Sequence, residues 1–259
     1  MKSIKLLLAV VGFLLLTLEQ SYGQEQVEKI SSGRPDLTQG TYTVPQGMLQ
    51  VEAGLTLWQD TQNEDKITSH AYPNVLVRIG LVKGLELRLQ GMVQDSIIKN
   101  ETGRRKVNGI GPLNVALRVQ LWEQNGLLPQ AALQSGLNLP VGSKEVTPRH
   151  ADPEFVLALS HELNQRFDLT YNLGYSWEES EPLQSYGVNL TADVSDKLMT
   201  YIEVLGEKQK GEKAEHFADM GLMFLLQNNL QLDVGAGIGL SKAAPDLFIS
   251  TGISFRLPR

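Results

Sequence analysis

Residues 49–58 read LQVEAGLTLW, and their side chains alternate in polarity along the stretch. The odd positions from Leu49 to Leu57 are apolar, whereas the even positions from Gln50 to Thr56 are polar or small. Alternation with a period of two separates the two kinds of side chain onto opposite faces of a β-strand. The stretch therefore predicts a strand with one apolar face and one polar or crowded face.

The same alternation recurs along the rest of the chain and predicts about twelve strands in all. The further strands are expected at Asn74–Leu81, Leu85–Gln94, Leu113–Trp122, Gln130–Leu139, Glu154–Leu163, Phe167–Trp177, Ser185–Val194, Leu198–Gly206, His216–Leu226, Leu230–Leu240 and Leu247–Leu257. Very short turns alternate with longer polar loops, such as Gln59–Thr68 and Asp95–Gly109. Gly84, Gly126 and Asn229 end short turns, where a left-handed backbone is expected.

Short turns at one end of the strands and long loops at the other are typical of bacterial outer-membrane barrels. Most predicted strands have about nine to eleven residues, the length that a tilted strand needs to cross a bilayer. Every lysine after residue 23 lies outside the predicted strands, although a solvated sheet face would normally carry some. Apolar side chains inside a closed barrel of about twelve strands would also leave a broad apolar void. The predicted fold class is therefore all-β, a single transmembrane antiparallel up-and-down barrel.

The polar face of the strands is then expected to line the lumen. The candidate lumen-lining residues are Glu52, Arg78, Glu86, Arg88, Arg118, Glu154, Glu162, Asp193, Glu203, Asp219 and Asp233. The predicted hairpin between the second and third strands places Arg78 opposite Arg88. Because like charges at that distance repel, Glu52 and Glu86 are expected beside them. The cluster is either a charged constriction that selects solutes or a salt-bridge ladder that stiffens the wall and blocks the pore.

Residues 1–23 have the features of a cleaved secretory signal peptide, with an uncleaved anchor as the alternative. Lys2 and Lys5 precede the apolar run Leu6–Leu18, which at about thirteen residues is too short to cross a bilayer comfortably. Residues 24–46 are polar and turn-rich without periodicity. They are predicted to form a periplasmic leader that folds back into the barrel mouth or remains a disordered tail. The barrel is expected over residues 47–259.

Composition excludes several classes of function. The net charge of −6 and the lack of a basic stripe argue against nucleic-acid binding. The chain has no cysteine, so it has no disulfide, thiolate metal site, catalytic thiol or lipoprotein anchor. His70, His150 and His216 lack ligand spacing, so no metal or other cofactor is expected.

One pair of residues suggests an outer-membrane lipid hydrolase. Ser135 and His161 are both expected on the outward face of adjacent strands, where such an enzyme needs its nucleophile and base. The expected register places Ser135 nearer Leu157, about four residues from His161, which is too far for a hydrogen bond. The protein is therefore not expected to be an enzyme, and no catalytic residue is assigned.

Three segments near the start of the expected mature chain read RPDLTQ at residues 34–39, TVPQG at residues 43–47 and QVEAG at residues 50–54. This pattern resembles the opening of a family of outer-membrane transporters named for the meta-cleavage pathway of phenol degradation. Leu37 stands where members usually have an aromatic residue. GPLNVALRVQL at residues 111–121 is similar to the family's fourth-strand segment, with Pro112 where an acid often stands. The resemblance implies an outer-membrane β-barrel and the passage of small hydrophobic or aromatic compounds.

These observations predict a passive channel or transporter for small solutes in the outer membrane of a Gram-negative bacterium. Its expected partners are outer-membrane lipid and a small-molecule solute of unknown identity. A second hypothesis is a structural or adhesion barrel that binds partners through its outer loops, chiefly Asp95–Gly109. The lipid hydrolase is a third hypothesis.

Overall fold

The computed structural model describes residues 28–62, 65–101 and 103–258. The predicted signal peptide at residues 1–23 lies outside them. In this part of the chain, no helix is long and apolar enough to cross a membrane. The strands are β1 (Leu49–Gln62), β2 (Asp65–Val82), β3 (Leu85–Asn100), β4 (Gly103–Ile110), β5 (Leu113–Trp122), β6 (Gln130–Leu139), β7 (Asp152–Asn164), β8 (Phe167–Glu178), β9 (Glu181–Asp193), β10 (Leu198–Gln209), β11 (Glu215–Gln227), β12 (Leu230–Gly239) and β13 (Leu247–Leu257).

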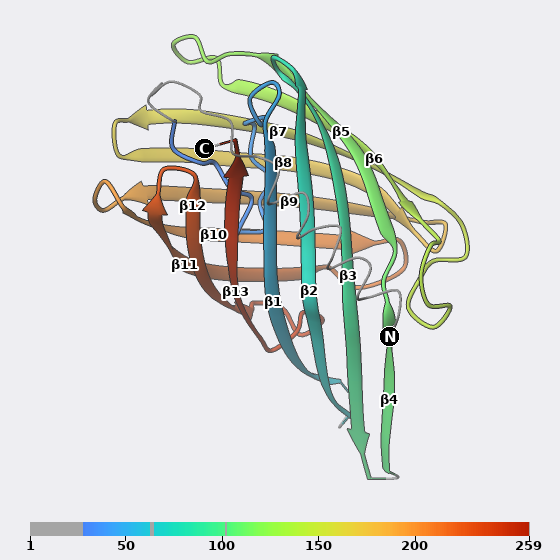
Figure 1. The fold of residues 1–259 in the computed structure, drawn as a ribbon. Coiled ribbons are helices and arrows are strands. Elements are labelled where there is room, and N and C mark those ends of the chain that lie inside the picture. Colours follow the sequence, from blue (N-terminus) through green and yellow to red (C-terminus); the bar gives the residue numbers. More distant parts are fainter. Residues whose placement is uncertain (1–27, 63–64, 102, 259) are drawn as a thin grey trace.

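The strands form one antiparallel sheet that closes on itself (Figure 1). Neighbours in sequence pair from β5 through β13, β13 pairs with β1, and β1 pairs with β2. The ring is completed by β2 with β3 and by β3 with β5. Of the thirteen strands, β4 stands outside this ring, paired to the outer part of β3, which leaves twelve in the barrel wall. Closure leaves no unpaired edge in the ring, and the predicted fold class is confirmed.

The apolar side chains lie on the outside of this barrel. On β5, Leu117 is 46% exposed, whereas its neighbours Ala116 and Arg118 are 2% and 3% exposed. The same order recurs on β12, where exposed Leu232 and Val234 flank buried Asp233. A soluble barrel would bury its leucines, so this inverted pattern requires an apolar solvent around the wall.

The outer ends of β1, β2 and β3, together with β4, form a sheet that projects beyond the other strands (Figure 1). We call this part the extension, and it comprises residues 59–62, 65–70, 95–100 and 103–110. The predictions of loops at Gln59–Thr68 and Asp95–Gly109 are wrong, because most of these residues pair as strands. The prediction that every lysine lies outside the strands fails for the same reason at Lys66, Lys99 and Lys106. It also fails at Lys208, because β10 extends to Gln209. Beyond the bilayer neither face of a strand needs to be apolar, so the alternation that reveals a strand is lost.

The short turns follow their predicted chemistry in part. Gly84 and Gly126 adopt φ angles of 77° and 58°, the left-handed region that glycine enters without steric cost. Asn229 was expected to do the same, but it is not among the residues with positive φ. Its side-chain amide instead donates to the Arg256 carbonyl oxygen at 3.1 Å, so the asparagine ties the β11–β12 turn to β13.

Replacing Leu117 with Arg tests the outward placement of the apolar face. A cationic side chain near the bilayer midplane costs about 2–4 kcal/mol, and the cost falls to about 0–1 kcal/mol near the interfaces. We expect L117R to lower the free energy of unfolding into urea from lipid vesicles by that larger amount. L121R, close to the short-turn end of the same strand, is the matched control. Equal stability of L117R and the wild type would place Leu117 away from lipid.

Candidate functional site

The described part of the leader, residues 28–46, lies inside the lumen. It enters at the short-turn end, where the Ile30 amide donates to the Asn228 carbonyl at 2.7 Å. It leaves at the same end, where the Gly47 amide donates to the Gly80 carbonyl at 2.9 Å just before β1. Between these points Thr41 and Val44 are buried. The segment is therefore a loop that dips into the barrel and returns.

Carboxylates of the barrel wall hold the backbone of this loop. The Leu37 and Thr38 amides donate to the two oxygens of Glu203 at 2.7 and 2.9 Å. The Gly33 amide donates to Glu52 Oε2 at 3.0 Å, and the Val44 amide donates to Glu86 Oε2 at 2.7 Å. A segment without helix or sheet must find acceptors for its buried N–H groups elsewhere. Three of the predicted lumen acids, Glu52, Glu86 and Glu203, supply them.

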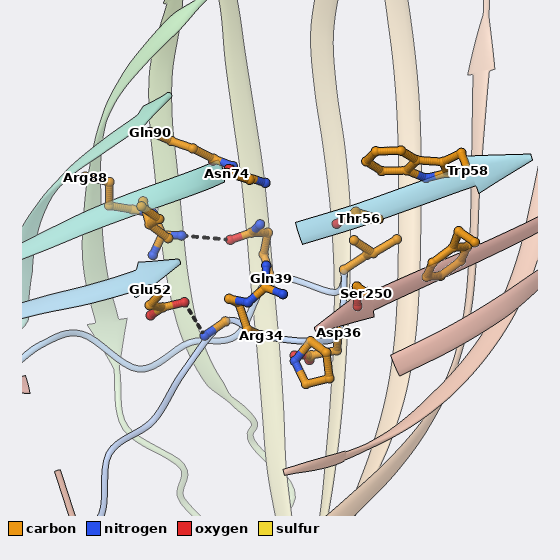
Figure 2. A pocket seen from close by; sticks show the side chains of 15 residues that line it. Arg34, Asp36, Gln39, Glu52, Thr56, Trp58, Asn74, Arg88, Gln90 and Ser250 are labelled. Carbon is orange, nitrogen blue, oxygen red and sulfur yellow. Dashed lines mark hydrogen bonds between the residues drawn. The ribbon is translucent and has the colours of Figure 1, made fainter. Parts of the chain in front are cut away.

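Leader side chains reach the wall in the same way. Arg34 forms a salt bridge with Asp233 at 3.3 Å. The Gln39 side-chain oxygen accepts hydrogen bonds from Arg88 and Arg118. In Figure 2, Arg34 and Gln39 extend from the leader between Glu52 and Arg88 on one side and the β13 residue Ser250 on the other. These contacts join the leader to opposite walls of the barrel.

Arg78 is the centre of the charged network at the end of the lumen where the leader enters. It is 2% exposed, and it forms salt bridges with Glu52 and Glu86 at 3.0 Å each. Its guanidinium also donates to the carbonyl oxygens of Ser31 at 3.0 Å and Tyr42 at 2.9 Å. One side chain therefore binds both arms of the leader loop and two acids of the wall.

The register pairs Arg78 with Arg88, which is the pairing that the hairpin pattern predicts. Glu86 separates the two positive charges, because its carboxylate also accepts from Arg88 Nη1 at 2.8 Å. The two acids that the sequence places beside Arg78 are thus its salt-bridge partners. Because the wall and leader use these groups, the cluster is a salt-bridge network that anchors a plug rather than a row of free charges.

The remaining predicted lumen residues differ in their contacts and in how far they are buried. Arg118 donates to the Gln134 side chain at 2.8 Å, and Gln134 in turn donates to Glu154 at 3.1 Å. Glu162 is exposed near the short-turn end, where it accepts from the Tyr42 hydroxyl at 3.2 Å. Asp219 and Asp233 are buried, whereas Asp193 at the end of β9 is partly exposed.

The leader residues Arg34, Asp36 and Gln39 complete the site, and sequence reasoning did not assign them a role. Asp36 accepts from the Asn189 side chain at 3.1 Å. Burial, together with the negative charges of Glu203 and Asp219, raises the pKa of the Asp36 carboxyl well above its usual range. The signal that could have identified these residues is the RPDLTQ segment itself, which spans residues 34–39 and makes most of the deep contacts.

The leader does not fill the lumen. A cavity of about 140 Å³ remains between the leader and the wall formed by β1, β2, β3 and β13 (Figure 2). A second cavity of about 290 Å³ lies on the other side, against β7, β8, β9 and β10. Both adjoin a vestibule of about 1140 Å³ on the long-loop side, since Trp58 also lines the first cavity and Glu207 the second. The lumen therefore narrows from a wide vestibule to two gaps beside the leader.

The β6–β7 connection folds inward over this vestibule. The Ile110 amide donates to Ser143 Oγ at 3.0 Å, and the Gln94 side chain donates to the Val146 carbonyl at 3.3 Å. A side chain at Gly109 would collide with Ser143, because an added Cβ would lie 2.4 Å from the serine Cβ. Gly109 thus permits the close approach that lets this loop narrow the vestibule.

Ser135 and His161, the pair on which the hydrolase hypothesis rests, do not lie close together. The register places Ser135 opposite Phe155, six residues from His161 along β7. His161 instead stacks on Tyr171 with ring centroids 6.1 Å apart. Among the described residues, no group of three or more His, Cys, Asp or Glu side chains is arranged to hold a metal ion.

Replacing Arg78 with Ala tests the charged network. The change leaves Glu52 and Glu86 buried without their main counterion, and breaking a buried ion pair in this way costs about 3–5 kcal/mol. We expect R78A to lose that much free energy of unfolding in lipid vesicles. K83A is the control, because the Lys83–Glu123 pair is almost fully exposed and such pairs contribute about 0–1 kcal/mol. Similar losses in both variants would contradict the network.

Comparisons with known proteins agree with this architecture. The fold is similar to an outer membrane channel from Pseudomonas putida F1, at 13% sequence identity and a TM-score of 0.65, covering 88% of this chain and 100% of that chain. It is also similar to the translocator domain of the autotransporter NalP from Neisseria meningitidis, at 12% identity and a TM-score of 0.54, covering 80% and 88%. The NanC porin matches at 9% identity and a TM-score of 0.53, covering 80% and 98%.

At these low identities the similarity concerns the fold, and the chain has the barrel fold of an outer membrane channel and a porin. A comparison with curated proteins finds no match. A family model with the description "Putative MetA-pathway of phenol degradation" matches residues 32–257. That match covers nearly the whole described chain and confirms the resemblance in the opening motifs. The chain belongs to this family of phenol-degradation-pathway proteins.

Proposed function

We propose that the protein is a passive channel of the bacterial outer membrane, through which small solutes, and hydrophobic or aromatic compounds in particular, move down their gradients. The observation that carries this proposal is the path through the lumen. A wide vestibule with aromatic and apolar side chains leads to two narrow gaps beside the leader.

The vestibule combines apolar side chains with charged ones. Trp58, Met92, Pro112 and Val146 line it, together with seven charged side chains, of which five are acidic and two are basic. Binding sites for small organic molecules commonly combine apolar and aromatic walls with a small number of polar groups. Trp58 offers a flat apolar surface to an aromatic ring. The Trp177 ring instead packs edge-on against the exposed Tyr175, with ring centroids 4.9 Å apart.

The size of the gaps limits what passes while the leader stays in place. A protein cavity of about 150 Å³ holds one benzene molecule, and the smaller gap has nearly that volume, about 140 Å³. The larger gap, of about 290 Å³, has room for a somewhat larger molecule. Single-ring compounds fit these gaps, whereas a larger solute requires the leader to move.

The electrostatics of the lumen favour a neutral or zwitterionic solute over an inorganic ion. Arg78 is neutralised by Glu52 and Glu86, and Arg34 by Asp233. The Glu203 carboxylate is occupied by two leader amides. Because these groups hold the leader and the gaps beside it are narrow, we expect low ion conductance in the resting protein.

Deleting residues 28–46 tests the channel proposal. Without the leader the two gaps merge into an open lumen, so we expect the single-channel conductance in planar bilayers to rise several-fold over that of the wild type. Heat-modified mobility on gels controls for correct folding of the shortened barrel. A folded, leaderless barrel that conducts no ions and swells no liposomes would rule out a channel.

The solute class has its own test in liposome swelling. Phenylalanine and serine are both zwitterionic and cross lipid slowly, but only one carries an aromatic ring. We expect replacement of Trp58 with Ala to slow phenylalanine entry at least twofold and to leave serine entry unchanged. W122A is the matched control, since Trp122 lies exposed on β5 away from the vestibule. Equal slowing of both solutes would contradict aromatic selectivity.

A further inference from the structure

The extension carries cations at the height where the apolar band of the barrel ends. On β3, Leu85, Leu87, Leu89 and Val93 share the outward face, because Met92 and Gln94, on either side of Val93, line the vestibule. Leu85 to Val93 spans about 26 Å along the strand, or about 20 Å along the membrane normal for a tilted strand. An apolar band on such barrels is about 25 Å tall. The outward face beyond Val93 therefore stands at the level of the lipid headgroups.

Four cationic side chains occupy that face, and we call them the basic stripe: Lys66, Lys99, Arg104 and Lys106. Lys66 on β2 pairs with Lys99 on β3, which pairs with Arg104 on β4. Lys106 lies two residues from Arg104 on the same face of β4, and all four residues are exposed. Cross-strand neighbours have Cβ atoms about 4.5–5.5 Å apart, and like charges placed directly opposite are destabilising.

The acids of the described chain do not neutralise this stripe. Asp95 is the carboxylate on the same face, and it forms a salt bridge with Lys106 at 2.9 Å. Among the described residues, no salt bridge joins Lys66, Lys99 or Arg104 to a carboxylate. Asp60 pairs with Ile67 on the opposite face of the sheet. Within the described residues, three of the four cations of the stripe are therefore free to bind an external anion.

Asp95 fixes the lower end of the stripe in place. Its carboxylate also accepts from Tyr72 Oη at 2.8 Å and contacts His70 Nδ1 at 2.6 Å. The Asp95 side chain is buried beneath these three groups. Lys106 uses one of its three ammonium donors on Asp95, which leaves donors for a second anion. Paired strands on both sides of β3 hold the other cations in register.

We propose that the basic stripe binds the phosphate groups of lipopolysaccharide, the phosphorylated glycolipid that forms the outer leaflet of the outer membrane. Phosphate oxygens suit the ammonium and guanidinium donors of this face. The exposed apolar residues Val93 and Ile110, just below it, are placed to contact the acyl chains of the same lipid. The binding depends on the barrel's position in the outer membrane and not on which solute passes through the lumen.

Binding of purified lipid A to the detergent-solubilised protein tests this assignment, with native mass spectrometry as the readout. The stripe variant carries Lys66→Gln, Lys99→Gln, Arg104→Gln and Lys106→Gln. The control variant removes four charges elsewhere through Lys83→Gln, Lys197→Gln, Lys213→Gln and Lys242→Gln. We expect the stripe variant to lose at least tenfold in affinity, the control to stay within twofold of wild type, and dephosphorylated lipid A to bind the wild type at least tenfold more weakly.

Several outcomes would overturn the proposal. One is equal binding of lipid A by the wild type and the stripe variant. Another is equal binding of phosphorylated and dephosphorylated lipid A by the wild type. A third is full competition by millimolar inorganic phosphate, which would indicate a site for free phosphate. The stripe lies outside the lumen, so its variant should keep the single-channel conductance of the wild type. A loss of lipid binding with normal conductance is thereby distinguished from a failure of the channel proposal.

Discussion

The occupied lumen depends on hydrogen bonds between backbone amides of the leader and carboxylates of the barrel wall. Glu52, Glu86 and Glu203 accept from four leader amides. An extended segment inside a barrel has no helix or sheet of its own, and each buried amide left without an acceptor costs about 1–3 kcal/mol. Arg78 forms salt bridges with two of these acids, and it also donates to two leader carbonyls. The wall and the leader therefore supply the hydrogen-bond partners that each other's buried polar groups need.

This reciprocity links the electrostatics of the barrel to its proposed transport. The charges that hold the leader are engaged in its contacts and are therefore less available to a passing ion. A solute in the vestibule meets the apolar surface of Trp58. In the proposed channel, the vestibule contacts the solute and the leader sets the width of its path.

The sequence predicts those parts of the structure where a local pattern of side chains shows which face meets lipid and which meets the lumen. Alternation along residues 49–58 identifies a strand and its lipid face, and the hairpin pattern pairs Arg78 with Arg88 and calls for Glu52 and Glu86 nearby. The path of the leader has no such pattern, because its contacts lie up to 199 residues away in the chain, as for Arg34 with Asp233. The extension was missed because strands wetted on both faces lose their apolar alternation.

The most direct test of the central claim is the reactivity of a single thiol in the leader. The chain has no cysteine, and Thr41 is fully buried whereas Leu127, in a short turn, is 96% exposed. If the leader occupies the lumen, T41C in the folded barrel should react with a bulky maleimide at least a hundredfold more slowly than L127C, and at the same rate after unfolding. Equal rates in the folded proteins would contradict the account.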